Sequence, residues 1–255
     1  MDEKSLELKK PYRNKISAGS YDLNKWLYGG YESDIITTIY GPAGSGKTNF
    51  VILAAVSQAK KSNKVIFIDT EGGLSIERVK QIAGEDTENV LKNIIILNPV
   101  DFNEQIKSFS KILDELKGKG KIGLIVVDGM TMLYRLELAE ASKRDNDKSI
   151  KEINSELAKQ LRILAEIARK NSIPVLVTNQ VYSEFLSREE MEKGQEKRVN
   201  MVGGDLLKYW SKCLIELIND RGKRKAIIRK HRSLKESELQ FIITNNGVRK
   251  RGILG

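Results

Sequence analysis

The chain has 255 residues, of which 40% are hydrophobic and 31% are charged, a balance typical of a soluble protein with a sizeable core. Its net charge of +10, from 44 basic and 34 acidic residues, fits an anionic partner such as nucleic acid, and the alternative is a lysine-rich surface that serves solubility. No apolar run reaches membrane-spanning length, the charged start lacks the apolar core of a secretory signal, and the single cysteine excludes an intrachain disulfide. These features predict a cytoplasmic protein without a membrane partner.

Residues 1–15 are charged and irregular and predict a flexible lead-in, whereas residues 16–255 are expected to form a single domain. Leu23, Trp26 and Leu27 follow at helical spacing and predict a short helix that ends before two glycines. We expect Trp26 and Leu27 to pack against the domain.

The stretch from 35 to 50, IITTIYGPAGSGKTNF, joins a β-branched apolar run to a segment of helical character. Between them, eight residues fit the phosphate-binding P-loop pattern without a gap: Gly41, Pro42, Ala43, Gly44, Ser45, Gly46, Lys47 and Thr48. The glycines let successive backbone N–H groups turn towards an anion, and the following helix adds its positive dipole end.

In such a loop Lys47 reaches the β- and γ-phosphates, the Thr48 hydroxyl ligates Mg²⁺, and Asn49 is the next residue at the nucleotide. The alternative is a glycine-rich strand–helix turn that matches by accident. Because a strand precedes the loop and a helix follows it, the context favours nucleotide binding.

Further strands are predicted at 64–69, 94–97 and 122–128, with helices at 75–83 and 101–116 between them. The 64–69 strand ends in Asp-Thr-Glu-Gly-Gly, at the sheet edge where open α/β sheets place their chemistry. The 122–128 strand ends in Asp128, the Walker B pattern, so Asp128 would hold Mg²⁺ through water opposite Thr48. The alternative role for Asp128 is a cap on the following helix.

A polar loop at 143–148, a long helix at 149–171 and a strand at 175–178 follow, and the strand ends at Asn179-Gln180. Residues 183–202 read either as a functional loop or as disorder. Runs at 213–218, 225–230 and 239–244 then alternate as strands, with turns at 219–222 and 245–247. The predicted fold is therefore α/β, a P-loop NTPase core whose mainly parallel sheet is flanked by helices and carries C-terminal antiparallel hairpin strands. Cys213 is expected to be a core residue rather than a nucleophile.

Four stretches in this order, GPAGSGKTNF, IDTEGGLSIERV, LIVVDGMTMLYR, and VLVTNQV followed by GGDLLKYWSK, resemble the RecA-type ATPase core of archaeal and eukaryotic DNA strand-exchange recombinases. The resemblance implies that the cofactor is ATP, that Glu71 polarises the attacking water, and that Gln180 senses the γ-phosphate. It also places the strand of Gln180 between the P-loop and Walker B strands. By the same resemblance Arg78 lies near adenine; the alternative is an ordinary surface arginine.

The family binds DNA through loops whose counterparts are 136–149 and 183–202, but both mix acidic with basic residues. Arg188 and Arg198 remain candidate contacts there. The densest basic cluster lies later in the chain and predicts sequence-independent binding of single- or double-stranded DNA, the alternative being a solvated sheet face. Its members are Arg221, Lys223, Arg224, Lys225, Arg229, Lys230 and Arg232.

Only about fifteen residues precede the core, so the N-terminal helix–hairpin–helix domain and the filament-forming linker of full recombinases are not expected. The resemblance therefore implies a monomer or small homo-oligomer with weak ATPase activity. Its role would be that of an accessory protein to a RadA-type recombinase in recombination and repair. Two alternatives stay open: a nearly inactive adaptor switched by nucleotide, and a KaiC-like ATPase outside recombination.

Overall fold

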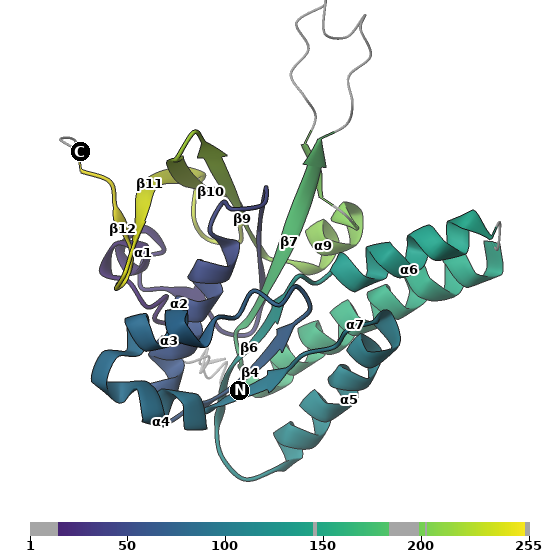
Figure 1. Ribbon diagram of the computed structural model, residues 1–255, viewed down its shortest axis with the longest axis horizontal. Coiled ribbons are helices and arrows are strands. Elements are labelled where there is room, and N and C mark those ends of the chain that lie inside the picture. Colours follow the sequence, from purple (N-terminus) through teal and green to yellow (C-terminus); the bar gives the residue numbers. More distant parts are fainter. Residues whose placement is uncertain (1–14, 145–146, 184–198, 202, 253–255) are drawn as a thin grey trace, which may run out of the picture.

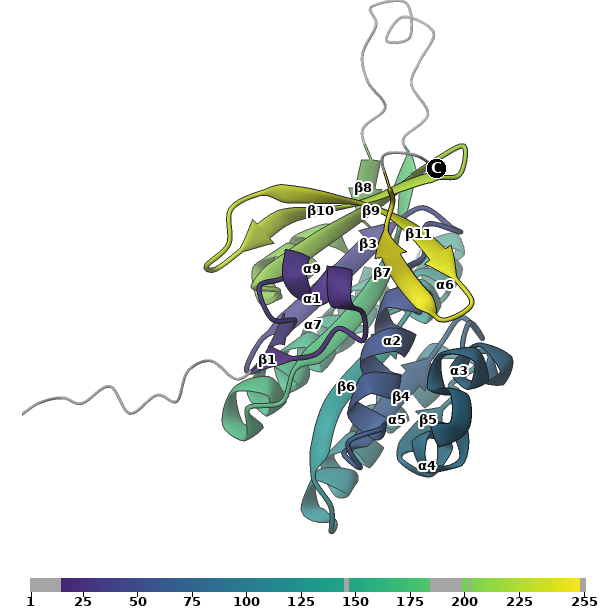
Figure 2. The same cartoon turned by 90° about the vertical axis from the view of Figure 1, so that its left-hand side faces the viewer.

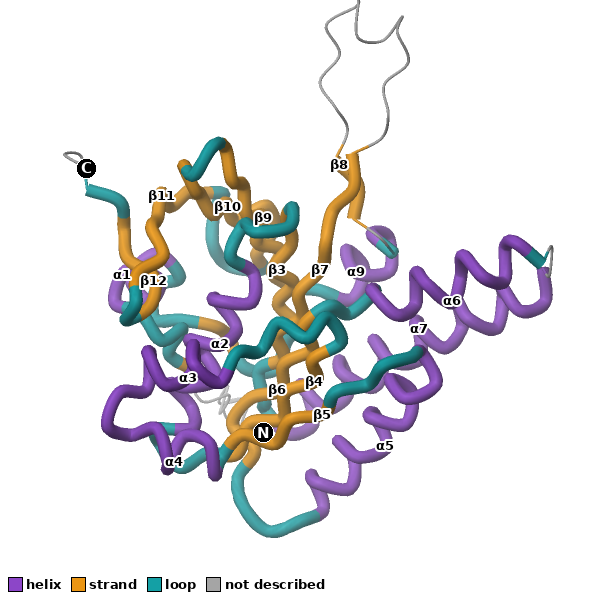
Figure 3. Tube along the Cα trace, in the orientation of Figure 1, coloured by secondary structure: helices purple, strands orange, loops and turns teal. Residues whose placement is uncertain are grey.

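The computed structural model describes residues 15–144, 147–183, 199–201 and 203–252. Its centre is a ten-stranded sheet with the order β12-β11-β10-β9-β3-β7-β6-β4-β5, and β8 pairs with β7 outside this path (Figures 1 and 3). The parallel strands are β3 (Ile36–Gly41), β4 (Lys64–Asp69), β5 (Ile94–Leu97), β6 (Ile122–Asp128), β7 (Val175–Ser183) and β9 (Cys213–Asp220), which pairs with β3. The antiparallel strands are β8 (Val199–Met201), β10 (Lys223–His231), β11 (Ser237–Thr244) and β12 (Gly247–Lys250), while β1 (Lys15–Ile16) and β2 (Tyr31–Glu32) form a separate pair.

Helices cover both faces of the parallel part, as Figure 1 shows. One face carries α2 (Lys47–Ala59), α3 (Ile76–Ala83) and α4 (Thr87–Lys92), with the 3₁₀ turn Gly84–Asp86 between the last two. The other carries α5 (Phe102–Lys117), α6 (Met132–Lys143), α7 (Asp147–Asn171) and α9 (Gly204–Trp210). No helix of the described residues is long and apolar enough to cross a membrane.

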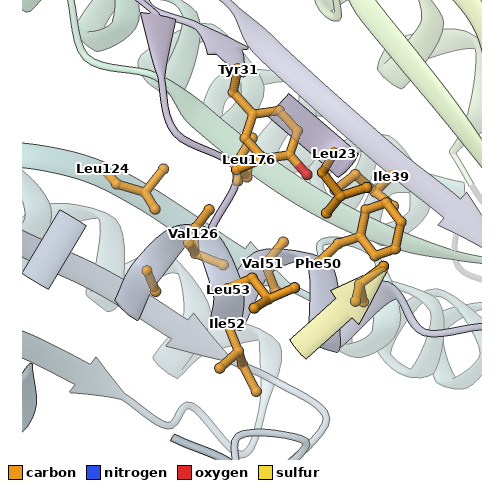
Figure 4. Close-up of a cluster of buried hydrophobic side chains, with 14 of the residues drawn as sticks. Leu23, Tyr31, Ile39, Phe50, Val51, Ile52, Leu53, Leu124, Val126 and Leu176 are labelled. Carbon is orange, nitrogen blue, oxygen red and sulfur yellow. The ribbon is translucent and has the colours of Figure 1, made fainter. Parts of the chain in front are cut away.

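The alternation of side chains along β6 explains why this strand is apolar up to Asp128. Leu124 and Val126 join the core under α2, whereas Ile125 and Val127 join the core under α5 and α7. Figure 4 shows Leu124 and Val126 in the first of these cores, near the side chains of α2. A parallel strand covered on both faces has no solvent side, so every residue of β6 is buried.

An edge-to-face aromatic pair joins the P-loop helix to the C-terminal strands. Phe50 of α2 and Phe241 of β11 are fully buried, with ring centroids 5.1 Å apart and an interplanar angle of 66°. Phe241 also lies beside the P-loop, since a Cβ built on Gly46 would be 3.6 Å from its ring. Strand β11 therefore forms one side of the P-loop region.

The edge strand β12 is covered by α1 (Tyr21–Trp26) rather than left open. The Ser20 hydroxyl donates to the Val248 carbonyl at 2.5 Å, and the Lys250 N–H donates to the Asp22 carboxylate at 2.7 Å. In Figure 2 α1 lies beside the β9–β10 hairpin, and α1 residues share a groove with residues of β10 and β11. These bonds satisfy backbone groups that an exposed sheet edge would present to other chains.

Several sequence expectations are confirmed. The strands at 64–69, 94–97 and 122–128 have the predicted bounds, and β7 lies between β3 and β6 as the family resemblance implied. Trp26 and Leu27 are buried, as expected. The turn between β9 and β10 has positive φ at both Arg221 and Gly222, the conformation of a type I′ hairpin.

Other expectations about the elements are wrong. The stretch 136–149, expected as a loop, is helical through Lys143 and again from Asp147, because α6 packs Leu133, Tyr134 and Ala141 into the core. The strand predicted to end at Thr178 continues to Ser183, because β8 pairs with its last three residues. The pairs β1–β2 and β11–β12 were not predicted as such. The lead-in at 1–14 and most of 183–202 lie outside the described residues.

Cys213 is 2% exposed at the start of β9, and burial raises the pKa of its thiol to about 12. Because only the thiolate is nucleophilic, we expect Cys213 to react with Ellman's reagent at pH 8 at least about 100-fold more slowly than a free thiol. The measurement is the absorbance of the thiolate released from the reagent, with guanidinium-unfolded protein as the control. Fast reaction of the native protein would contradict burial of this side chain.

Candidate nucleotide-binding site

The P-loop connects the end of β3 to the start of α2. Gly44 and Gly46 have φ values of 70° and 109°, which side-chain-bearing residues rarely adopt. No side chain caps the N-terminus of α2, a helix of 13 residues, so its first N–H groups are available to an anion. The local sequence therefore forms an anion-binding loop, in which the glycines allow the backbone conformation and the helix supplies aligned N–H donors.

Lys47, the first residue of α2, is 6% exposed and folds back over the loop. Its ammonium group donates to the carbonyls of Gly41 and Pro42, at 3.0 Å each. Burial lowers the pKa of Lys47, and the negative charges of Glu71 and Asp128 oppose this shift. The cation therefore lies within the electrostatic influence of both carboxylates.

Asp128 ends β6 and is 1% exposed. One of its oxygens accepts a bond from the Thr178 hydroxyl at 2.5 Å, while the other, Oδ2, has no partner in the described part of the chain. Burial raises the pKa of Asp128 to about 6, against the lowering effect of the Thr178 bond and of the nearby Thr48 hydroxyl. A buried carboxylate oxygen without a partner beside a threonine hydroxyl matches the oxygen ligands that Mg²⁺ prefers.

The alternative role of Asp128 as a helix cap is wrong, because Thr131 occupies the N-cap position of α6 and no side chain caps that helix. Ser45 is a further buried group in the P-loop whose hydroxyl has no partner among the described residues. Thr178, which bonds Asp128, was missed by the sequence reasoning. The signal for it was a polar residue at the end of an otherwise apolar strand.

Glu71 and Gln180 meet above the carboxyl ends of β4 and β7. The Gln180 amide donates to Glu71 Oε2 at 2.9 Å. Behind this pair, the Thr131 hydroxyl donates to Oδ1 of Asn179, which is 1% exposed. The two residues that the family resemblance singles out near the γ-phosphate are therefore in direct contact with each other.

Arg78 of α3 lies across the open side of the site. Its Nε donates to Asn49 Oδ1 at 2.8 Å, and its Nη1 donates to Gln81 Oε1 and to the Asn245 carbonyl, both at 2.9 Å. The guanidinium group thus ties α2, α3 and the β11–β12 turn together. It lies next to Asn49 in the first turn of the P-loop helix.

The basic cluster predicted as a DNA contact does not form one free patch. Arg229 pairs with Glu216 and Glu236, both at 2.6 Å, and Lys225 lies 3.7 Å from Glu238. Lys230 donates to two backbone carbonyls, and Arg224 donates to the Gly44 carbonyl at 3.5 Å. Within the described residues, Arg221 and Lys223 form no ion pair. Arg188 and Arg198 lie outside the described residues.

Arg232 is bound to the opposite end of the chain, with Nε 2.5 Å from Glu32 and Nη2 2.6 Å from Asp34. Burial acts to raise the pKa of Glu32, but the bonds from Arg232 and Ser233 outweigh it and lower the pKa. A lowered folded-state pKa gives stability that is present above the unfolded pKa and is lost as the pH falls.

We therefore expect Arg232→Ala to lower the free energy of unfolding by about 2 kcal/mol at pH 7, because it leaves the Glu32 charge buried without its partner. The difference from wild type should shrink below the ordinary Glu pKa of 4.5. Urea unfolding at pH 7 and pH 4 measures this difference, with Arg162→Ala, which removes an exposed partner of Glu166 on α7, as the control. A difference that is equal at both pH values would contradict this origin.

Residues 12–251 match the family described as Rad51. The chain is 42% identical over 227 residues to the DNA repair and recombination protein RadB of Methanococcus maripaludis, which covers 89% of this chain and 96% of the relative. It is 40% identical over 239 residues to the RadB of Methanobrevibacter smithii, covering 92% and 95%, and 43% identical over 226 residues to that of Methanocaldococcus jannaschii, covering 89% and 98%. The chain therefore belongs to the Rad51 family, with archaeal RadB proteins among its relatives.

Proposed function

We propose that this protein binds ATP and Mg²⁺ at the P-loop, binds DNA, and takes part in DNA repair and recombination as an accessory to a RadA-type recombinase. Membership of the Rad51 family and the names of the relatives support the repair and recombination role. The observation that carries the nucleotide site is the buried Asp128 oxygen without a partner beside the P-loop helix.

The residues present fit this cofactor. The backbone of Gly41–Thr48 and the N-terminus of α2 would hold the phosphates, with Asn49 and Arg78 on the nucleoside side. Thr48 and Asp128 would hold Mg²⁺, which neutralises charge on the phosphate oxygens when bound. The partnerless Ser45 hydroxyl and Asp128 oxygen are the groups that such a ligand would satisfy.

Hydrolysis would use groups at the ends of β4 and β7. Glu71 would accept the proton of the attacking water, and Lys47 would balance negative charge as it develops. Gln180 would pass the state of the site to the segment that follows β7. The Gln180 amide holds Oε2 of Glu71, which leaves only Oε1 to accept a proton from water in the present arrangement, and we expect slow turnover.

The role in repair and recombination is supported by the relatives' names, and the accessory part of the proposal by helix α6. Helix α6 occupies most of the stretch where full recombinases are expected to carry a DNA-binding loop. We propose a single core domain, active as a monomer or small homo-oligomer in the cytoplasm, that stabilises or loads the recombinase on DNA.

Turnover is the experiment that tests the reaction: ATP hydrolysis with and without single-stranded DNA, in wild type and Glu71→Gln. We expect slow hydrolysis that falls about 100-fold in Glu71→Gln, because a positioned general base contributes on this order. Turnover that Glu71→Gln leaves unchanged would remove the proposed base. No turnover, with DNA binding that still responds to ATP, would favour the nucleotide-switched adaptor, which the Glu71–Gln180 bond also supports.

DNA contact is proposed at the β9–β10 turn, where Arg221 and Lys223 have no ion pair among the described residues. We expect Arg221→Ser with Lys223→Ser to weaken DNA binding about tenfold near 0.1 M salt and to reduce the salt slope by about 2. Fluorescence anisotropy with a labelled oligonucleotide measures both. The matched control is Lys107→Ser with Lys111→Ser, which removes the same charge from exposed positions of α5. Equal weakening by both pairs would contradict a local contact.

A further inference from the structure

Asp69, the last residue of β4, is a buried carboxylate with only 5% exposure. Its Oδ1 accepts the backbone N–H groups of Glu71 and Gly73, at 3.2 and 3.1 Å. Its Oδ2 accepts the N–H of Leu74 at 2.9 Å. Asp69 takes part in no ion pair within the described residues. Its charge is therefore balanced by three backbone donors of a single short loop.

These bonds separate Asp69 from the other acidic residues of the site. Asp128 keeps an oxygen without a partner, and Glu71 has its carboxylate at Gln180, whereas both oxygens of Asp69 are already bonded to the chain. A carboxylate committed in this way is poorly placed to ligate a metal or to accept a proton from water. The Asp69 carboxylate instead anchors the backbone of the loop that follows β4.

The anchored loop, residues 70–74, passes directly over the proposed catalytic groups. A Cβ built on Gly73 would lie 3.3 Å from Thr48 Oγ1 and 3.4 Å from Asp128 Oδ2. At the other end of the loop, the Thr70 hydroxyl donates to the Gly129 carbonyl at 2.7 Å. The position of the Glu71 backbone is therefore fixed from below by Asp69 and from the side by Thr70.

We propose that Asp69 is a positioning residue: its carboxylate sets the loop 70–74 so that Glu71 stands where it can act on water at the γ-phosphate. This inference rests on the proposed ATP hydrolysis. Asp69 itself touches no reactant. Its effect passes through Glu71, and this indirect action predicts a distinctive kinetic result.

The main variant is Asp69→Asn, which keeps the shape of the side chain but turns an N–H towards the backbone donors. We expect kcat for ATP to fall about 10- to 100-fold while KM changes less than about threefold, because geometry at the base is lost and nucleotide binding is not. In a Glu71→Gln background, Asp69→Asn should lower kcat by less than about twofold, because the effects of residues that act as a unit are not additive.

Asp101→Asn is the matched control. Asp101 also accepts a backbone N–H, from Glu104 at 2.7 Å, but it caps α5 away from the site. We expect its kcat and KM to equal those of wild type. Thermal unfolding of each variant fixes an assay temperature at which all of them are folded.

Three results would overturn the inference. They are a normal kcat in Asp69→Asn, a rise in KM with kcat unchanged, and an undiminished loss in the Glu71→Gln background. A wild-type protein without turnover would instead overturn the proposed function, and this role with it. If Asp69→Asn does not fold, amide hydrogen exchange of the wild type decides, because unprotected N–H groups at Glu71, Gly73 and Leu74 would contradict the anchor.

Discussion

Replacing Lys47 by alanine is expected to reduce ATP turnover about 100-fold or more, because the variant loses the cation that balances phosphate charge in a partly desolvated site. The ammonium group donates to the carbonyls of Gly41 and Pro42, so it already lies at the P-loop. Its charge also lies within reach of Glu71 and Asp128.

Two measurements check this expectation. The first is phosphate release, and the second is the shift of the thermal midpoint on adding ATP with Mg²⁺, since ligand at 100 times Kd stabilises a protein by about 2.7 kcal/mol. Wild type should show the shift and Lys47→Ala should lose most of it. Lys60→Ala, at the C-terminal end of the same helix and paired with Asp86, is the control. A full thermal shift in Lys47→Ala would contradict the assigned role.

Phe241→Ala is expected to lower the free energy of unfolding by about 3–5 kcal/mol, the usual cost of deleting a buried aromatic ring. The ring is fully buried and packs edge-to-face on Phe50, so the variant leaves a cavity and removes an aromatic contact. Because Phe241 also lies beside Gly46, we expect weaker nucleotide binding as well as lower stability.

Urea unfolding measures the loss of stability, and the thermal shift with ATP and Mg²⁺ measures the effect on the loop. Tyr21→Ala is the control, because Tyr21 is a large aromatic residue that is 78% exposed. We expect Tyr21→Ala to change the free energy of unfolding by no more than about 0.5 kcal/mol. A loss below about 1 kcal/mol in Phe241→Ala would show that the surrounding side chains refill the cavity.

The parallel strands and the P-loop are readable from sequence because their signals are local. Strands β4, β5 and β6 are short apolar runs bounded by polar or glycine residues, so their bounds follow from composition alone. Helix α6 was missed because only three of its residues, Leu133, Tyr134 and Ala141, are buried, and three positions give little periodicity. Strand β12 has four residues and escapes prediction for the same reason.

The partners of the charged side chains, in contrast, could not be predicted from the sequence. Sequence places Arg229, Lys230 and Arg232 in one basic run, but folding brings acidic partners to the two arginines from distant positions. Glu32 and Asp34 lie about 200 residues before Arg232, and Glu216 comes from the neighbouring strand. Counting charge along the chain cannot find such partners. The same holds for the Glu71–Gln180 contact, whose members are 109 positions apart.

The hydrogen bonds between α1 and β12 affect the order in which parts of the molecule can fold during synthesis. The bonds Ser20–Val248 and Asp22–Lys250 each join residues 228 positions apart, and the Phe50–Phe241 pair is nearly as distant. During synthesis the P-loop helix leaves the ribosome long before β11, which forms one side of the P-loop region. Contacts of such long range form late and slow folding. The nascent chain therefore carries an exposed apolar helix face until translation is almost finished, and nucleotide binding is expected to be among the last properties it acquires.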